Sequence, residues 1–343
     1  MANAFNGRSI FKYALILVLF FVFIELINFK FDRLKSKDYL YSLTSATLNG
    51  QMVDDDDDEY KLKSEDETDL KLFRAFLTEI REVSSVQKLV SIDYLLTTIK
   101  FMINEVDEYD PALIRFVRSI IQHPHDRSEL NLRNKKQTDF SQYEQSSKID
   151  RLLSRETNGF FIEAGGFEGE SLSNTLFFEL ERAWTGLLIE PVPTFYRSIQ
   201  SKKRHIYSIN ACIAEKRPFV AKFRVSGALS GVEAEMSALH LSRIKSESIQ
   251  YNSTEEIAYI PCFSLNTIMR ALNRTTVDYF SLDVEGAELS VLRSLDYKQL
   301  NIRSFSIEWA AKQSDKQPII EHLKQNGYSL RLEDICDIYF TKN

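Results

Sequence analysis

A short apolar strand that runs straight into a glycine turn constrains the fold of this chain most. Phe160–Glu163 is apolar and ends in a carboxylate, and Gly165, Gly166 and Gly169 follow at once. The apolar residues of Ser171–Glu181 then have helical spacing. A strand, a glycine turn and a helix open a nucleotide-binding α/β unit, in which glycine lets the backbone approach a ligand closely. The spacing differs from the dinucleotide fingerprint G-x-G-x-x-G, which weakens an NAD or FAD interpretation.

Later strands repeat this pattern. Gly186–Glu190 is apolar and ends in an acid about 20 residues beyond the glycines, where a carboxylate can accept hydrogen bonds from ribose hydroxyls. Val277–Asp283 also ends in an acid, and Glu285 and an apolar helix follow it. Further strands are expected at Ile206–Ile213, Ile302–Glu308, Tyr328–Leu332 and Ile335–Phe340.

The acids at the strand ends indicate the kind of ligand. Open parallel sheets bind ligands at the carboxyl ends of their strands, so Glu163, Glu190, Asp283 and Glu285 are expected to share one crevice. Such a crevice suits a cationic or hydroxyl-rich ligand better than a polyphosphate, which the carboxylates would repel. Two plainer interpretations stay open: a ligand-free sheet with tight turns, and helix N-capping by Asp283 and Glu285.

The composition excludes several classes of protein and site. Of the 343 residues, 44% are hydrophobic and 27% are charged, as in an ordinary globular protein. The net charge of −6 argues against a nucleic-acid partner. Three cysteines are too few for a disulfide scaffold, although one bridge remains possible. No metal site is expected, because His123 and His125 flank Pro124 without a nearby third ligand.

The N-terminal region contains a candidate membrane anchor. Ile10–Phe29 supplies the roughly 20 residues that a helix needs to cross a bilayer. We expect an uncleaved signal anchor in a single-pass membrane protein, with a cleaved signal peptide or a buried core helix as alternatives. Basic residues after the span favour a cytoplasmic location for the rest of the chain. Glycosylation sequons at Asn252 and Asn273 favour a lumenal one.

The chain is expected to have five parts. They are a tail at 1–9, the transmembrane anchor at 10–29, an acidic flexible stalk at 30–68, a helical region at 69–150 and an α/β domain at 151–343. The stalk contains the acidic run Asp54–Glu59, whose charges repel one another and stay hydrated. In the helical region, Asp110 followed by Pro111 is typical of a helix start.

With these motifs the chain resembles the FkbM-type, S-adenosylmethionine-dependent methyltransferases and, more closely, the membrane-anchored Star protein family of animals. The resembling stretches are Asp110–Arg115, Gly159–Asn174, Trp184–Pro193, Asn210–Ala214 and Thr275–Leu292. The resemblance implies a class I methyltransferase-like (Rossmann-like) α/β fold. Its sheet would be mostly parallel and seven-stranded, with a reversed last hairpin.

The resemblance also implies roles for individual residues. By matching positions, S-adenosylmethionine would contact Glu163, Gly165, Gly166, Gly169 and Glu190. Asp283 and Glu285 would face the methyl acceptor, and Asp283 would be the candidate base for an acceptor hydroxyl. The chain departs from the enzymes in two places, because Glu163 replaces the usual Asp and Ser281 replaces a common Lys.

Two functions of different classes follow from the resemblance. One is assistance to the trafficking of a membrane-bound, EGF-like growth-factor cargo between the endoplasmic reticulum, the Golgi apparatus and endosomes. The other is an active O-methyltransferase for a glycan or lipid hydroxyl. Star-like topology is type II, with the domain in the lumen. In that oxidising compartment Cys212 and Cys262 are the favoured disulfide pair, with three free thiols as the alternative.

Overall fold

The computed structural model describes residues 92–251, 256–309 and 314–343. These residues belong to one unit, Val83–Asn343. The expected tail, anchor and stalk lie outside the described residues, as do the first part of the helical region and Asn252. Among the helices of the described ranges, none has the length and apolar character that a membrane crossing needs.

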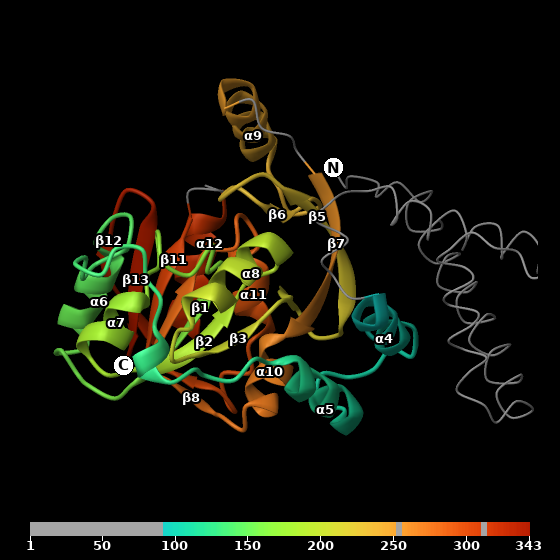
Figure 1. Cartoon of the computed structure of the whole chain (residues 1–343), viewed down its shortest axis with the longest axis horizontal. Helices are drawn as coiled ribbons and strands as arrows, with labels where there is room; N and C mark the ends of the chain where they lie inside the picture. Colours follow the sequence, from blue (N-terminus) through green and yellow to red (C-terminus); the bar gives the residue numbers. More distant parts are fainter. Residues whose placement is uncertain (1–91, 252–255, 310–313) are drawn as a thin grey trace, which may run out of the picture. The chain divides into compact units, whose positions relative to one another are not determined.

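A seven-stranded mixed sheet forms the centre of the unit, in the order β12-β13-β11-β9-β1-β2-β3 (Figure 1). Its strands are β1 (Phe160–Ala164), β2 (Thr185–Ile189), β3 (Tyr207–Ile209), β9 (Tyr279–Leu282), β11 (Ser304–Glu308), β12 (Tyr328–Glu333) and β13 (Asp337–Lys342). The pairs from β3 through β2, β1 and β9 to β11 are parallel, and β13 is antiparallel to both β11 and β12. The sheet therefore has the seven strands and the reversed last hairpin that the resemblance implied.

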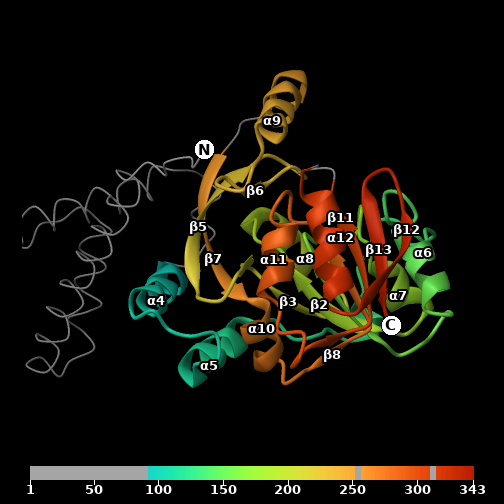
Figure 2. The same ribbon diagram turned by 180° about the vertical axis from the view of Figure 1, so that it is seen from behind.

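The central strands β1, β2 and β9 are almost entirely buried because helices cover both faces of the sheet. All five residues of β1 are buried. Phe160 and Ile162 share one core with residues of α5 (Pro111–Ile120), α10 (Leu265–Ala271), α11 (Glu288–Ser294) and α12 (Lys316–Gln325). Phe161 on the opposite face packs with residues of α6 (Gln145–Leu152), α7 (Leu176–Glu181) and α8 (Pro193–Lys202). Figures 1 and 2 show these two helical layers from opposite sides.

A second, four-stranded sheet lies beside the first and has the order β4-β7-β5-β6. Its strands are β4 (Cys212–Ala214), β5 (Phe219–Val225), β6 (Gly231–Val232) and β7 (Glu256–Ser264). Cys212 and Cys262 are paired across β4 and β7 and form a disulfide, the pairing favoured from the sequence. Since 50 positions separate them, the bridge closes a loop that contains β5, β6 and α9 (Ala238–Tyr251).

The helical region before the sheet contains the helix start that the sequence predicted. Asp110 caps α5 by accepting the N–H groups of Ala112 and Leu113, and Pro111 is the first residue of the helix, as predicted. The preceding helix, α4 (Ile92–Ile103), packs on β5 and β7 of the second sheet. The shorter elements are the 3-10 helix at Arg127–Glu129 and the parallel pair β8 (Thr276–Val277) and β10 (Asn301–Ile302).

Candidate functional site

The glycine turn lies at the carboxyl edge of the seven-stranded sheet, the edge where β1, β2, β9 and β11 end. Gly165 has a φ of +88°, and a Cβ there would lie 1.9 Å from the carbonyl oxygen of Asp283. A Cβ at Gly166 would lie 2.1 Å from the side chain of Leu188 on β2. Both positions therefore need glycine, because the turn is pressed against the two neighbouring strands. Gly169 closes the turn by donating its N–H to the carbonyl of Gly166.

The Glu163 carboxylate is buried and forms its hydrogen bonds with other groups of the protein. It is 2% exposed and accepts hydrogen bonds from the Ser173 hydroxyl at 2.9 Å and the Asn174 N–H at 2.6 Å. It also accepts from the Thr175 hydroxyl, and an Arg204 guanidinium nitrogen lies 3.9 Å away. Burial raises the pKa of Glu163, and the Arg204 charge opposes that shift. These contacts hold the loop after β1, so the carboxylate faces this network instead of the expected crevice.

Glu190 follows β2 and is 3% exposed. Its carboxylate accepts the N–H of Val192 at 2.7 Å and also that of Phe167 in the glycine turn. Burial raises the pKa of Glu190 to about 8. The rings of Phe167 and Phe195 pack with their centroids 4.5 Å apart. The acid thus has the expected place at the strand end, but it already joins the glycine turn to the start of α8.

An acidic group, defined here as Asp283, Glu285, Glu288 and Glu308, gathers where β9 and β11 end. Carboxylate oxygens of three of them, Asp283, Glu288 and Glu308, lie within 4.8 Å of one another. The pKa of Asp283 is raised well above its ordinary value, first by burial and then by the charges of Glu285 and Glu308. Oxygen ligands at this spacing can hold a metal cation, whereas the sequence analysis expected no metal site.

Asp283 and Glu285 were predicted to lie together, and the structure brings them together. Asp283 has no hydrogen-bond or ion-pair partner for its carboxylate among the described residues. Neither acid caps α11, whose N-cap residue is Ala287. Glu288 instead accepts the N–H groups of Val284 and Gly286 at 2.9–3.1 Å and fixes the turn between β9 and α11. The N-cap interpretation of the sequence is therefore wrong for both predicted residues.

His240 of α9 is a site residue that the sequence analysis missed. Its Nδ1 lies 3.4 Å from a carboxylate oxygen of Glu285, and its Nε2–H donates to the carbonyl of Leu229 at 3.0 Å. Burial lowers the pKa of His240. Glu285 itself has a φ of +56° in the left-handed region, which turns its side chain toward α9. A lone histidine in an unrecognised helix gave no signal, because only the fold brings α9 over the end of β9.

The structure also describes Ser281, one of the two departures from the family pattern, and Asn273 of the second sequon. Ser281 is buried on β9 and accepts a hydrogen bond from the Asn174 side-chain amide at 2.9 Å. Asn273 of the second sequon is exposed, as is Thr275.

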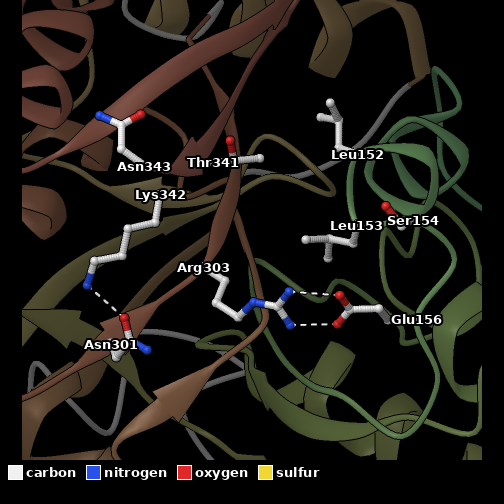
Figure 3. Close-up of a pocket in the computed structure, with 9 residues that line it drawn as sticks. All are labelled: Leu152, Leu153, Ser154, Glu156, Asn301, Arg303, Thr341, Lys342 and Asn343. Carbon is white, nitrogen blue, oxygen red and sulfur yellow. Dashed lines mark hydrogen bonds and ion pairs between the residues drawn. The ribbon is translucent and has the colours of Figure 1, made fainter.

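A separate pocket lies at the opposite, amino edge of the sheet (Figure 3). Its volume is about 480 Å³, and Leu153, Arg303 and Lys342 are among its lining residues. The Arg303 guanidinium forms a paired contact with the Glu156 carboxylate, and the Lys342 ammonium donates to Asn301. The pocket is distinct from the acidic group and from the glycine turn, because it lies at the other edge of the sheet. Its charged groups are paired with neighbouring side chains.

Residues 163–330 match the family model described as the methyltransferase FkbM domain. No curated protein matched the chain.

Three solved structures illustrate the structural similarity. Precorrin-6y C5,15-methyltransferase from Geobacter metallireducens is 10% identical, with a TM-score of 0.32, over 64% of this chain and 98% of that one. A methyltransferase from Pyrococcus furiosus is 10% identical, with a TM-score of 0.33, over 62% and 89%. A human methyltransferase 10 domain containing protein is 11% identical, with a TM-score of 0.31, over 67% and 96%. At these scores the structural likeness carries no argument about substrate or mechanism. From the family match and the strand order, residues 163–330 of this chain form a methyltransferase-like domain.

Proposed function

We propose that this domain binds S-adenosylmethionine at the carboxyl edge and directs its methyl group to an acceptor hydroxyl. The observation that carries the proposal is the acidic group. Asp283 and Glu285 stand at the end of β9, one strand from the glycine turn, and their pKa values are raised by burial and by repulsion from neighbouring carboxylates. A bound cation would relieve this repulsion, and the sulfonium of S-adenosylmethionine is a cation.

The residues present fit the cofactor better at one end than at the other. At the sulfonium end, the Asp283 carboxylate has no partner among the described residues and is partly exposed. At the ribose end, Glu190 is buried and already accepts the N–H groups of Val192 and Phe167. Ribose hydroxyls would therefore compete with the Phe167 N–H for the Glu190 carboxylate. Glu163 supports the loop from behind and is not assigned a contact with the cofactor.

When bound, the cofactor supplies an electrophilic methyl group on a positively charged sulfur. The contribution of the chain is mainly alignment of donor and acceptor, which can lower a barrier by about 7–11 kcal/mol in favourable cases. An acceptor hydroxyl also has to lose its proton. Asp283 is the candidate base, because its raised pKa brings proton uptake closer to neutral pH.

Calorimetric titration of S-adenosylhomocysteine into the soluble unit Val83–Asn343 tests the proposal. Binding in the micromolar range is expected. Gly165→Ala should abolish it, because the new Cβ would collide with the Asp283 carbonyl and displace the turn.

Gly327→Ala is the matched control for that variant. Gly327 has a similar φ of +86°, but no atom lies within 4 Å of the position that a Cβ would take there, and the residue lies outside the site. Binding that survives in Gly327→Ala and is lost in Gly165→Ala supports the proposal. Absence of binding by the folded wild-type unit contradicts it.

A second function, assistance to the trafficking of membrane-bound growth-factor cargo in the secretory pathway, is favoured by a different observation. The carboxylates of Glu163 and Glu190 are both buried and accept hydrogen bonds from groups of the protein itself. This arrangement is consistent with a domain that keeps the methyltransferase fold without catalysing methyl transfer. The Cys212–Cys262 disulfide and the exposed Asn273 sequon support a lumenal domain in the endoplasmic reticulum, Golgi apparatus or endosomes.

A rescue experiment in cells distinguishes the two functions. Full-length chain carrying Gly165→Ala would be returned to cells that lack it, and export of an EGF-like membrane-bound precursor would be followed. Rescue by a folded, binding-deficient variant supports the trafficking function without catalysis. Failure of that variant, with rescue by Gly327→Ala, supports a requirement for the cofactor.

A further inference from the structure

The first turn of α9 is joined to the end of β9 through His240. The imidazole Nδ1 lies 3.4 Å from a carboxylate oxygen of Glu285, and the Nε2–H donates to the Leu229 carbonyl at 3.0 Å. Both side chains are enclosed, since that of His240 is 2% exposed and that of Glu285 is 15% exposed. One side chain of α9 therefore contacts both the turn after β9 and the loop between β5 and β6.

Gly231 of β6 provides a surface on which the following segment rests. A Cβ at Gly231 would lie 3.1 Å from the methyl group of Met236 and 3.4 Å from the Cβ of Glu285. Because glycine has no side chain, Met236 and Glu285 can both approach the same stretch of backbone. Since β6 pairs with β5, this surface belongs to the second sheet and is fixed by it.

The segment that rests on Gly231 has an apolar core of its own. Leu229, Met236 and Ile244 form a buried cluster, with Leu241 packed against it, and this cluster is separate from the cores of the two sheets. Ile244 follows His240 by about one helical turn, so both side chains leave α9 on the same side. A segment with a small separate core can detach while the cores of the sheets stay packed.

We define the arm as residues 236–251 and its seat as Leu229, Gly231 and Glu285. Figures 1 and 2 show α9, the main part of the arm, projecting from the rest of the unit. Burial raises the pKa of Glu285, and the Arg243 charge on α9 opposes that shift. The arm therefore presents positive charge to the acidic group.

We propose that the arm is a lid on the acceptor side of the acidic group. Seated on Glu285, the arm covers that carboxylate; released, it admits an acceptor to Asp283 and Glu285. The inference rests on the proposed function, in which these two acids face the acceptor. An acceptor that approaches Glu285 has to take the place of the His240 ring, so the seated arm makes an autoinhibitory contact.

Chemical labelling of Glu285 tests the proposal. The full-length chain would be treated with a water-soluble carbodiimide and glycine ethyl ester, and the labelling rate of each carboxylate would be followed by mass spectrometry. In wild type, Glu285 should be labelled slowly compared with the exposed Glu129. Ile244→Asp should raise the rate at Glu285 about tenfold or more, because a carboxylate in the apolar cluster weakens the seating of the arm while His240 is still present.

Lys245→Asp is the matched control. It introduces the same carboxylate at the next residue of α9, where the side chain is exposed and outside the cluster, so labelling of Glu285 should equal that of wild type. Hydrogen–deuterium exchange shows which part has loosened, because Ile244→Asp should speed exchange in α9 and leave β9 protected. If β9 loses protection, the milder pair Ile244→Ala and Lys245→Ala takes the place of the two aspartate variants, and the same outcomes apply.

Each outcome decides the matter. Faster labelling of Glu285 in the Ile244 variant, with β9 still protected and the Lys245 variant like wild type, supports the lid. Wild-type Glu285 that is labelled as fast as Glu129 overturns it, because the carboxylate would then be uncovered. Slow labelling of Glu285 in the Ile244 variant also overturns it, whether or not α9 exchanges faster. The labelling needs no bound cofactor, so this result is separate from the outcome of the S-adenosylhomocysteine titration.

Discussion

At the scale of single residues, two carboxylates with the same sequence signature have different environments. Glu163 and Glu190 both stand at the end of an apolar strand, and both are buried. Glu163 lies near the guanidinium of Arg204, whereas the partners of Glu190 within the described part of the chain are the N–H groups of Val192 and Phe167. The pattern of a strand ending in an acid predicts the position of such a group, but its partners come from distant parts of the chain.

The pH dependence of stability should report on Glu190. Burial raises its pKa from 4.5 to about 8, so between these values the folded protein holds a proton that the unfolded chain has lost. The contribution of this group is therefore full below about pH 4.5 and falls as the pH rises toward 8. In wild type this group should make the free energy of unfolding fall by up to about 1.4 kcal/mol per pH unit over this range. Glu190→Gln should remove that contribution to the slope, because glutamine does not titrate.

Urea unfolding at pH 5.5 and pH 8.0 measures this effect in wild type and variant. The pKa values of Asp283 and Glu285 are raised as well, so the unfolding free energy of the variant will still depend on pH to some extent. Glu129→Gln is a suitable control, since Glu129 is an exposed partner of Lys203. An identical pH slope in wild type and Glu190→Gln would contradict the proposed protonation of this group.

At the scale of elements, the sequence predicted those that have a strong local pattern. Phe160–Glu163 and Gly186–Glu190 correspond to β1 and β2 within one residue at each end. Helical spacing over Ser171–Glu181 overestimated α7, which begins only at Leu176. The earlier residues form a loop instead, because the hydroxyls of Ser173 and Thr175 bind the Glu163 carboxylate.

The second sheet shows why other elements escaped prediction. Ile206–Ile213 was expected as one strand, but it divides into β3 and β4, which belong to different sheets. The bend between them is held by the Asn210 amide, which donates to the carbonyls of Glu190 and Pro191. Contacts of this kind leave no periodic signal. For the same reason, α9 and its His240 were absent from the predicted site.

The disulfide should be an important source of stability for the second sheet. It closes a loop across 50 positions, for which chain entropy suggests a stabilisation of about 4 kcal/mol. The double variant Cys212→Ser and Cys262→Ser should lower the free energy of unfolding by about that amount or less. Cys336→Ser, which removes the free thiol, should change it little. Equal stability of the double variant and wild type would show that the bridge adds nothing to the fold.

At the scale of the whole molecule, the two edges of the seven-stranded sheet differ in chemistry. The amino edge carries a pocket whose charged groups pair with one another, such as Arg303 with Glu156. The carboxyl edge carries the glycine turn and the acidic group. The strand order predicted from the family resemblance places these features together, since parallel strands all end at the same edge.

The relative affinity of the unit Val83–Asn343 for S-adenosylmethionine and S-adenosylhomocysteine tests the central claim most directly. The two molecules share the ribose and the amino-acid part, but only the first has a charged sulfur. If the acidic group accommodates a cation, S-adenosylmethionine should bind about tenfold more tightly, which corresponds to roughly 1.4 kcal/mol. Asp283→Asn combined with Glu285→Gln should remove this preference while the protein stays folded. Equal affinities in wild type, or tighter binding of S-adenosylhomocysteine, would contradict a sulfonium site at the end of β9.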